Sequence, residues 1–129
     1  MPYAERLGEL AAERGVDVSY DQLTIRDMDV CDAPHMHRVL DTIEARLAEG
    51  RTVYVHCWGG IGRTGMTIGC WLVRHGRAGD EALADVARLF ATTSPAKRAR
   101  HPEGSPQTPE QRTMVRAWAR EERGDGARA

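Results

Sequence analysis

A glycine-rich stretch near the middle of the chain constrains the fold more than any other feature. The strand-forming run 51–56 leads into Cys57, glycines follow at positions 59, 60 and 62, and Arg63 opens a helical pattern. In this order, backbone N–H groups of the turn can converge on an oxyanion, and the helix dipole adds positive potential. Glycines leave room for a ligand and permit tight turns. The stretch therefore predicts a phosphate-binding loop between a strand and a helix.

The spacing of Cys57 and Arg63 separates this loop from a nucleotide-binding loop. Five residues lie between the two, and the Gly-Lys-Ser/Thr ending of ATP-binding loops is absent. The string at 56–65, HCWGGIGRTG, resembles the signature of the protein tyrosine phosphatase and dual-specificity phosphatase superfamily. The resemblance extends over residues 3–118 and implies a cysteine-dependent phosphatase.

The resemblance assigns the central chemistry to Cys57 and Arg63. A helix N-terminus and a nearby arginine lower the pKa of a thiol, so Cys57 is expected to attack phosphorus as a thiolate and form a phosphocysteine. The planar guanidinium of Arg63 offers two parallel donors to phosphate oxygens and stabilises the transition state. The other expected substrate-binding residues are Trp58, Gly59, Gly60, Ile61 and Gly62.

Two neighbours of the loop have supporting roles in the family. Thr64 stands where the family has serine or threonine, and its hydroxyl is expected to donate a hydrogen bond to Cys57, which becomes a better leaving group. The alternative for Thr64 is an ordinary first-turn threonine. His56 orients the loop and helps to set the cysteine pKa in the family, but a single histidine at a strand end could equally be a core residue.

The proton donor for the leaving group is expected on a loop before the cysteine. The family places an aspartate there, and Asp27, Asp29 and Asp32 are candidates. The segment 24–27, Thr-Ile-Arg-Asp, matches the Pro-Ile-Arg-Asp of many bacterial members except for its first residue. Asp32 falls where a helix cap is expected. We therefore assign Asp27 as the general acid, with Asp29 as the alternative.

Gln111 has two competing interpretations. It matches the glutamine of the family's Ser-Pro-x-Thr-x-x-Gln segment, here 105–111, which implies that it positions the hydrolytic water. It also completes a capping box with Thr108, with Pro109 at the first helical position. The residues themselves leave both interpretations open.

The order of elements predicts an α/β fold. The strand–helix–strand–helix order over 23–75 predicts a parallel βαβ unit, with the phosphate loop at the carboxyl end of its strand. We expect a central, mostly parallel sheet flanked by helices, as in dual-specificity phosphatases. Helices are expected at 3–14, 32–49 and 63–76, from Asp80 and from Thr108. Asp80 is the expected cap of its helix, and Gly50 is the expected stop of the helix at 32–49. Extended segments are expected at 16–20, 23–26 and 51–56, and a polar loop at 91–107.

The size of the chain predicts one phosphatase domain over 1–129, with a frayed tail at 124–129. Because only two residues precede Tyr3, the family's first strand or strands would be missing. An exposed sheet edge would then permit self-association.

Net charge and cysteine content limit the expected partners and the expected compartment. A net charge of −1 argues against nucleic acid or a membrane surface as a partner. Neither a spanning helix nor a signal peptide is recognisable. An odd count of three cysteines fits a reducing cytoplasm. Cys31 lies on the expected acid loop, so a protective Cys31–Cys57 disulfide is a further hypothesis, whereas Cys70 is expected in the core.

These features predict a hydrolase of phosphate monoesters without a metal or other cofactor. His35 and His37 do not form a metal pair, because residues two apart on a helix face different sides. The expected substrate is a phosphorylated protein or peptide, bearing phosphotyrosine or phosphoserine/threonine. One alternative is a phosphate-binding module without turnover. Another is a phosphoinositide or inositol-phosphate phosphatase, although the uncharged residues 58–62 offer no lysine to additional phosphates.

Overall fold

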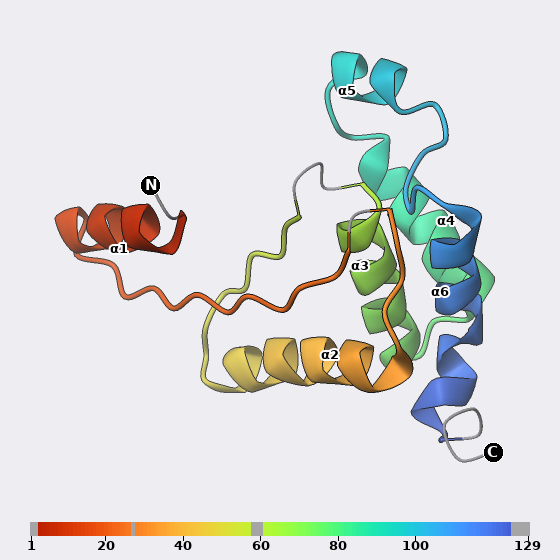
Figure 1. Cartoon of the computed structure of the whole chain (residues 1–129), viewed down its shortest axis with the longest axis horizontal. Coiled ribbons are helices and arrows are strands. Elements are labelled where there is room, and N and C mark those ends of the chain that lie inside the picture. The colour runs from red at the N-terminus through yellow and green to blue at the C-terminus, as the bar shows by residue number, and fades with distance from the viewer. Residues whose placement is uncertain (1–2, 27, 58–60, 125–129) are drawn as a thin grey trace.

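The computed structural model describes residues 3–26, 28–57 and 61–124, and helices dominate these ranges (Figure 1). The helices expected from the sequence are confirmed, and the segment that we expected to be a polar loop contains the additional short helix α5. The helices of the described ranges are α1 (Tyr3–Glu13), α2 (Ala33–Ala48), α3 (Arg63–Arg74), α4 (Gly79–Phe90), α5 (Pro95–Arg100) and α6 (Pro109–Glu122).

Local capping residues determine where α2 begins and ends. The Asp32 carboxylate accepts a hydrogen bond from the backbone N–H of His35 at 2.8 Å, and proline occupies the first turn. The helix is followed by Gly50 at φ +79°, a conformation that glycine adopts without strain. The predicted N-cap and stop of this helix are therefore confirmed.

The other two capping predictions have different outcomes. At α6, the Thr108 hydroxyl accepts from the Gln111 backbone N–H, and the Gln111 side chain accepts from the Thr108 backbone N–H, so the predicted capping box is confirmed. At α4, the predicted Asp80 cap is wrong, because the helix already begins at Gly79. There the Glu81 carboxylate accepts the backbone N–H of Ala78 at 3.2 Å.

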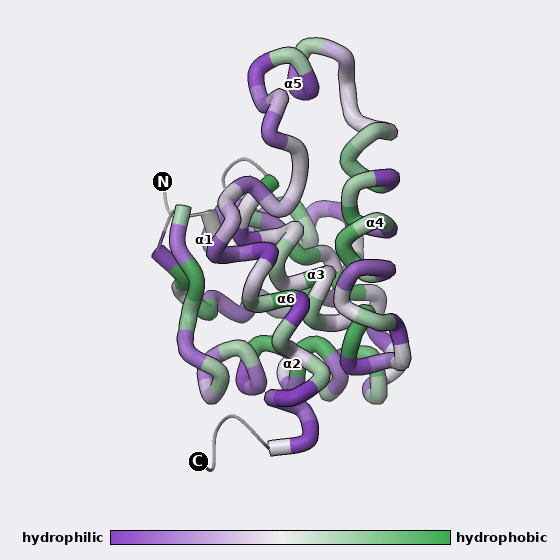
Figure 2. Tube along the Cα trace, turned by 90° about the vertical axis from the view of Figure 1, so that its right-hand side faces the viewer, coloured by the Kyte–Doolittle hydropathy of each residue, from purple (hydrophilic) through white to green (hydrophobic). Residues whose placement is uncertain are grey.

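The core lies where α3, α4 and α6 pack on one another and α2 packs on α3. Green and purple residues alternate along α4 in Figure 2, as expected for a helix with one apolar face. Gly69 permits a close approach of α3 and α6, since a Cβ there would lie 2.7 Å from Cγ2 of Val115. The fully buried apolar residues include Met36, Leu40, Met66, Cys70, Val115 and Trp118.

A polar network at one edge of the core joins α2, α3 and α6. The Arg74 guanidinium donates to Glu122 at 2.7 Å and to Asp41 at 2.9 Å. The indole N–H of Trp118 donates to the same oxygen of Glu122 at 2.8 Å. The Arg74 side chain is only 11% exposed, so these contacts compensate for its removal from water.

The predicted central sheet is wrong for the part of the chain that the structure describes. Segments 16–20, 23–26 and 51–56 are extended, but none of the described residues is in a β-strand. A strand exists only when its N–H and C=O groups pair with a neighbouring strand. Here 17–25 and 51–57 both line a cavity, and their ends meet through an Arg51–Asp17 ion pair of 2.6 Å. Without a sheet in the described residues, the predicted βαβ unit is wrong there, and no sheet edge supports self-association.

Candidate active site

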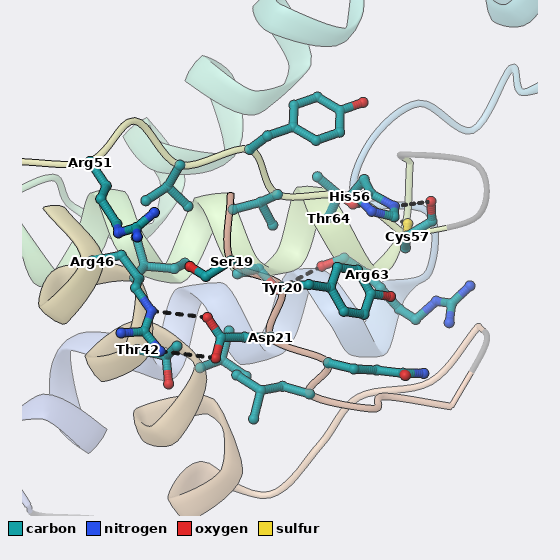
Figure 3. A pocket seen from close by; sticks show the side chains of 18 of the residues that line it. Ser19, Tyr20, Asp21, Thr42, Arg46, Arg51, His56, Cys57, Arg63 and Thr64 are labelled. Carbon is teal, nitrogen blue, oxygen red and sulfur yellow. Dashed lines mark hydrogen bonds and ion pairs between the residues drawn. The ribbon is translucent and has the colours of Figure 1, made fainter. Parts of the chain in front are cut away.

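A cavity of about 710 Å³ lies beside the N-terminus of α3, bounded by the extended segments 17–25 and 51–57 and by α2. Figure 3 shows Cys57, Arg63 and Thr64 toward one end, and Arg46 and Arg51 toward the other. The extended run 51–57 brings the cysteine to the cavity, and α3 begins directly at the arginine. The cavity therefore has a nucleophile and a cation at the same end.

The thiol of Cys57 faces the first turn of α3. The Thr64 hydroxyl donates a hydrogen bond to Sγ of Cys57 at 3.0 Å, and both residues are partly buried. A hydroxyl donor at this distance favours the thiolate over the neutral thiol. Cys57 and the first turn of α3 are thus placed as a cysteine nucleophile requires.

The guanidinium of Arg63 connects the phosphate loop with the segment before α2. Its Nη1 donates to the backbone carbonyl of Ile25 at 3.1 Å. The Thr67 hydroxyl donates to the Arg63 carbonyl at 2.9 Å, one turn further along the helix. Sequence reasoning missed the Ile25 carbonyl, since no motif marks a backbone acceptor.

The described end of the phosphate loop is buried and supported from the segment before α6. Ile61 is 2% exposed, and its carbonyl accepts a hydrogen bond from the hydroxyl of Ser105. A Cβ at Gly65 would collide with the same Ser105 hydroxyl, so glycine is required for this contact. The Ser-Pro pair of the family segment was visible in the sequence, but its support of the loop was not predicted.

The side chain of Gln111 is completely buried against the phosphate loop. Its Oε1 accepts the backbone N–H groups of Gln107 and Thr108, each at 3.0 Å. Its Nε2 donates to the backbone carbonyl of Asp29 at 3.1 Å. A Cβ at Gly62 would lie 2.9 Å from Nε2 and 3.0 Å from Oε1, so the amide lies directly on this glycine.

Four of the predicted site residues, Asp27, Trp58, Gly59 and Gly60, lie outside the described residues. The two other acid candidates are described. The Asp29 carboxylate accepts the backbone N–H of Val30 at 2.8 Å, and Asp32 caps α2. Both carboxylates thus have structural hydrogen bonds.

His56 has an exposed side chain, whose Nδ1 lies 3.4 Å from the carbonyl of Cys57. The imidazole is therefore next to the nucleophile's own peptide group. This position is compatible with its expected role in orienting the loop.

The other two cysteines belong to the core. Cys70 is completely buried, and Cys31 is half-buried in the same apolar cluster. Burial, together with the nearby Asp32 carboxylate, raises the pKa of Cys31 to about 11. A thiol with such a pKa is a poor source of thiolate at neutral pH, which makes it a slow partner for disulfide formation with Cys57.

The described ranges, residues 3–26, 28–57 and 61–124, contain no group of three or more His, Cys, Asp or Glu side chains placed to hold a metal ion. They also contain no helix with both the length and the apolar character needed to cross a membrane.

Comparison with known protein families defines the class of this site. The family model described as "Polymorphic toxin system, DSP-PTPase phosphatase" matches residues 4–77, which include the cysteine, the arginine and the predicted acid. Because the match covers more than half of the chain, the protein belongs to this family. The resemblance to the dual-specificity and tyrosine phosphatase superfamily is therefore confirmed.

The chain is also similar to a curated phosphatase. The phosphatidylglycerophosphate phosphatase PTPMT1 of Arabidopsis thaliana is 35% identical over 71 residues, or 53% of this chain. The aligned part is only 21% of that relative, so the chain spans about a fifth of its length.

Proposed function

We propose that this protein hydrolyses phosphate monoesters through a phosphocysteine intermediate on Cys57. The observation that carries the proposal is the 3.0 Å hydrogen bond from the Thr64 hydroxyl to Sγ of Cys57, at the cavity end that Arg63 also lines. Membership of a phosphatase family supports the same chemistry. The planar fork of Arg63 is suited to hold two phosphate oxygens.

The reaction has two displacement steps. In the first, the Cys57 thiolate attacks phosphorus, the bond to the leaving oxygen breaks, and Asp27 gives that oxygen a proton. In the second, water attacks the phosphocysteine, the P–S bond breaks, and Asp27 takes a proton from the water. The hydrogen bond from Thr64 stabilises the thiolate that leaves in this second step.

The substrate that we propose is a phosphorylated protein or peptide. The cavity continues well beyond the cysteine along mostly neutral and apolar side chains, which suits a bulky group such as a phosphotyrosyl ring. The family description supports a role as the phosphatase module of a polymorphic toxin system. The odd cysteine count supports action in a reducing compartment such as the cytoplasm.

A second candidate is a glycerophospholipid carrying a terminal phosphate. It is favoured by the relative whose name specifies phosphatidylglycerophosphate. The apolar part of the cavity lining could accommodate an uncharged portion of such a substrate.

Phosphate release from a substrate panel tests these proposals. The panel contains an aryl phosphate, phosphotyrosine and phosphoserine peptides, and phosphatidylglycerophosphate in mixed micelles, with Cys57→Ser as the control protein. We expect turnover of the aryl phosphate and the phosphotyrosine peptide, unchanged after dialysis against a chelator. Binding of phosphate without release from any substrate would instead identify a phosphate-binding module. Preference for the micellar substrate would favour the lipid candidate.

A further inference from the structure

The Gln111 carboxamide contacts the phosphate loop at Gly62, the predicted acid loop at Asp29 and the N-terminus of α6 at Thr108. It is fully buried. It lies on Gly62, donates to the carbonyl of Asp29, and accepts from Gln107 and Thr108. The bond to Asp29 spans 82 residues of sequence, so it is a tertiary connection and no part of the helix cap.

The described residues before and after position 27 each accept a side-chain hydrogen bond through a backbone carbonyl. Before it, the Ile25 carbonyl accepts from Arg63 at 3.1 Å; after it, the Asp29 carbonyl accepts from Gln111 at 3.1 Å. Between these points Met28 has φ +64°, which is unfavourable for a side chain of this kind. A backbone in such a conformation persists only when its surroundings hold it in place.

We propose that Gln111 is a positioning residue for the general acid of this phosphatase. Its Nε2–H bond to the Asp29 carbonyl connects the segment after the predicted acid with Gly62, on which the same carboxamide lies. The inference rests on the proposed function, because it assumes that this loop carries the proton donor.

The hydrogen bonds of Gln111 argue against the water-positioning role that the family resemblance implies. A group that orients an attacking water accepts a hydrogen from it. The carbonyl oxygen of an amide can accept about two hydrogen bonds, and both are made here with backbone N–H groups. Gln111 therefore acts before the hydrolytic step, on the step in which the leaving group takes its proton.

The variant Gln111→Glu separates the cap from the connection to Asp29. A glutamate at this helix position can still accept from both backbone N–H groups, and these donors favour its ionised form. It has no hydrogen to donate to the Asp29 carbonyl. Gln111→Met, which removes all polar contacts at similar volume, is measured in parallel, so that the test does not depend on the folding of a single variant.

The readout is kcat/KM for two aryl phosphates with the full chain, because this constant reports on steps up to release of the first product. Phenyl phosphate needs a proton on its leaving oxygen, whereas 2,4-dinitrophenyl phosphate does not. We expect kcat/KM for phenyl phosphate to fall about tenfold or more, a fraction of what a general acid supplies. For the activated ester we expect less than about a threefold change. In an Asp27→Asn background, the Gln111 substitutions should add no further dependence on the leaving group.

The matched control is Thr108→Ala, which removes the hydroxyl acceptor of the same capping box and leaves the Gln111 side chain in place. It should lower the melting temperature while the ratio of the two kcat/KM values stays unchanged.

A fall in kcat with accumulated phosphoenzyme and unchanged kcat/KM in the Gln111 variants would establish the water-positioning role and overturn the proposal. Equal losses for both esters, or no loss, would also overturn it. A wild-type protein without turnover would contradict the proposed function itself, whereas an active wild type with insensitive variants would contradict only this inference.

Discussion

Arg63 has two structural roles at the candidate site. It lines the cavity beside Cys57, and its Nη1 donates to the Ile25 carbonyl. A guanidinium has five N–H donors, so it can bind two phosphate oxygens while it retains the bond to Ile25. An ammonium group cannot reproduce this planar geometry.

Arg63→Lys should therefore impair catalysis strongly although the charge is kept. We expect kcat/KM for an aryl phosphate to fall at least about a hundredfold, or about 2.7 kcal/mol of transition-state stabilisation. Steady-state kinetics of the purified variant measure this loss. If the loss is below about tenfold, Arg63 does not bind the phosphate.

The identity of the general acid can be tested by the pH dependence of the rate. We expect a bell-shaped profile in which Cys57 ionises on the acid limb and Asp27 loses its proton on the basic limb. Asp27→Asn should flatten the basic limb and should slow an alkyl phosphate more than an activated aryl phosphate. Asp29→Asn and Asp32→Asn are the controls. A basic limb that survives in Asp27→Asn and disappears in Asp29→Asn would identify Asp29 as the acid.

Single residues were predictable from the sequence where their contacts are local. Cys57, Arg63 and Thr64 stand within eight positions, so the motif alone brings them together. The carbonyls of Ile25 and Asp29 could not be found in this way. Their bonds to Arg63 and Gln111 span 38 and 82 residues, and backbone acceptors have no sequence signature.

Helices were predictable because they depend on local contacts, whereas a sheet depends on pairing between distant segments. The N-termini of α2 and α6 were predictable because Asp32 and Thr108 make their capping bonds to residues three positions away. The run 51–56 did predict an extended backbone, but β-propensity does not determine a pairing partner. In the structure, the residues that would form the sheet line a cavity instead. The sheet prediction failed at the step from local conformation to long-range pairing.

Glu122 of α6 connects this helix with α3 through Arg74. Its carboxylate accepts from Arg74 and from the buried indole of Trp118, so Glu122→Ala leaves both donors without this partner. We expect the free energy of unfolding to fall by about 1–3 kcal/mol, the range for buried donors that lose a partner, because Trp118 is fully buried and the Arg74 side chain is 11% exposed. Urea denaturation monitored by circular dichroism measures this change. Arg120→Ala, at an exposed position of the same helix, should change stability little; an equal effect in both variants would rule out the network as the cause.

The chain consists of a part that matches the family model, residues 4–77, and a C-terminal part that lies outside the match. The family model covers residues 4–77, which contain the nucleophile, the arginine and the predicted acid. Ser105 and Gln111 lie beyond it, yet they contact Ile61 and Gly62 of the phosphate loop. Residues from both parts thus form the candidate site. Helix α6 contributes both to the core and to the support of the phosphate loop.

In the proposed mechanism, Cys57 becomes covalently phosphorylated during turnover. Rapid acid quenching after mixing with an aryl phosphate, followed by peptide mass spectrometry, measures this directly. We expect one added phosphoryl group on the peptide that contains Cys57, formed as fast as the first product is released. The Cys57→Ser protein should bind the substrate without turnover. Full turnover with no phosphoryl group on Cys57, or substantial activity of Cys57→Ser, would exclude a phosphocysteine intermediate on this residue.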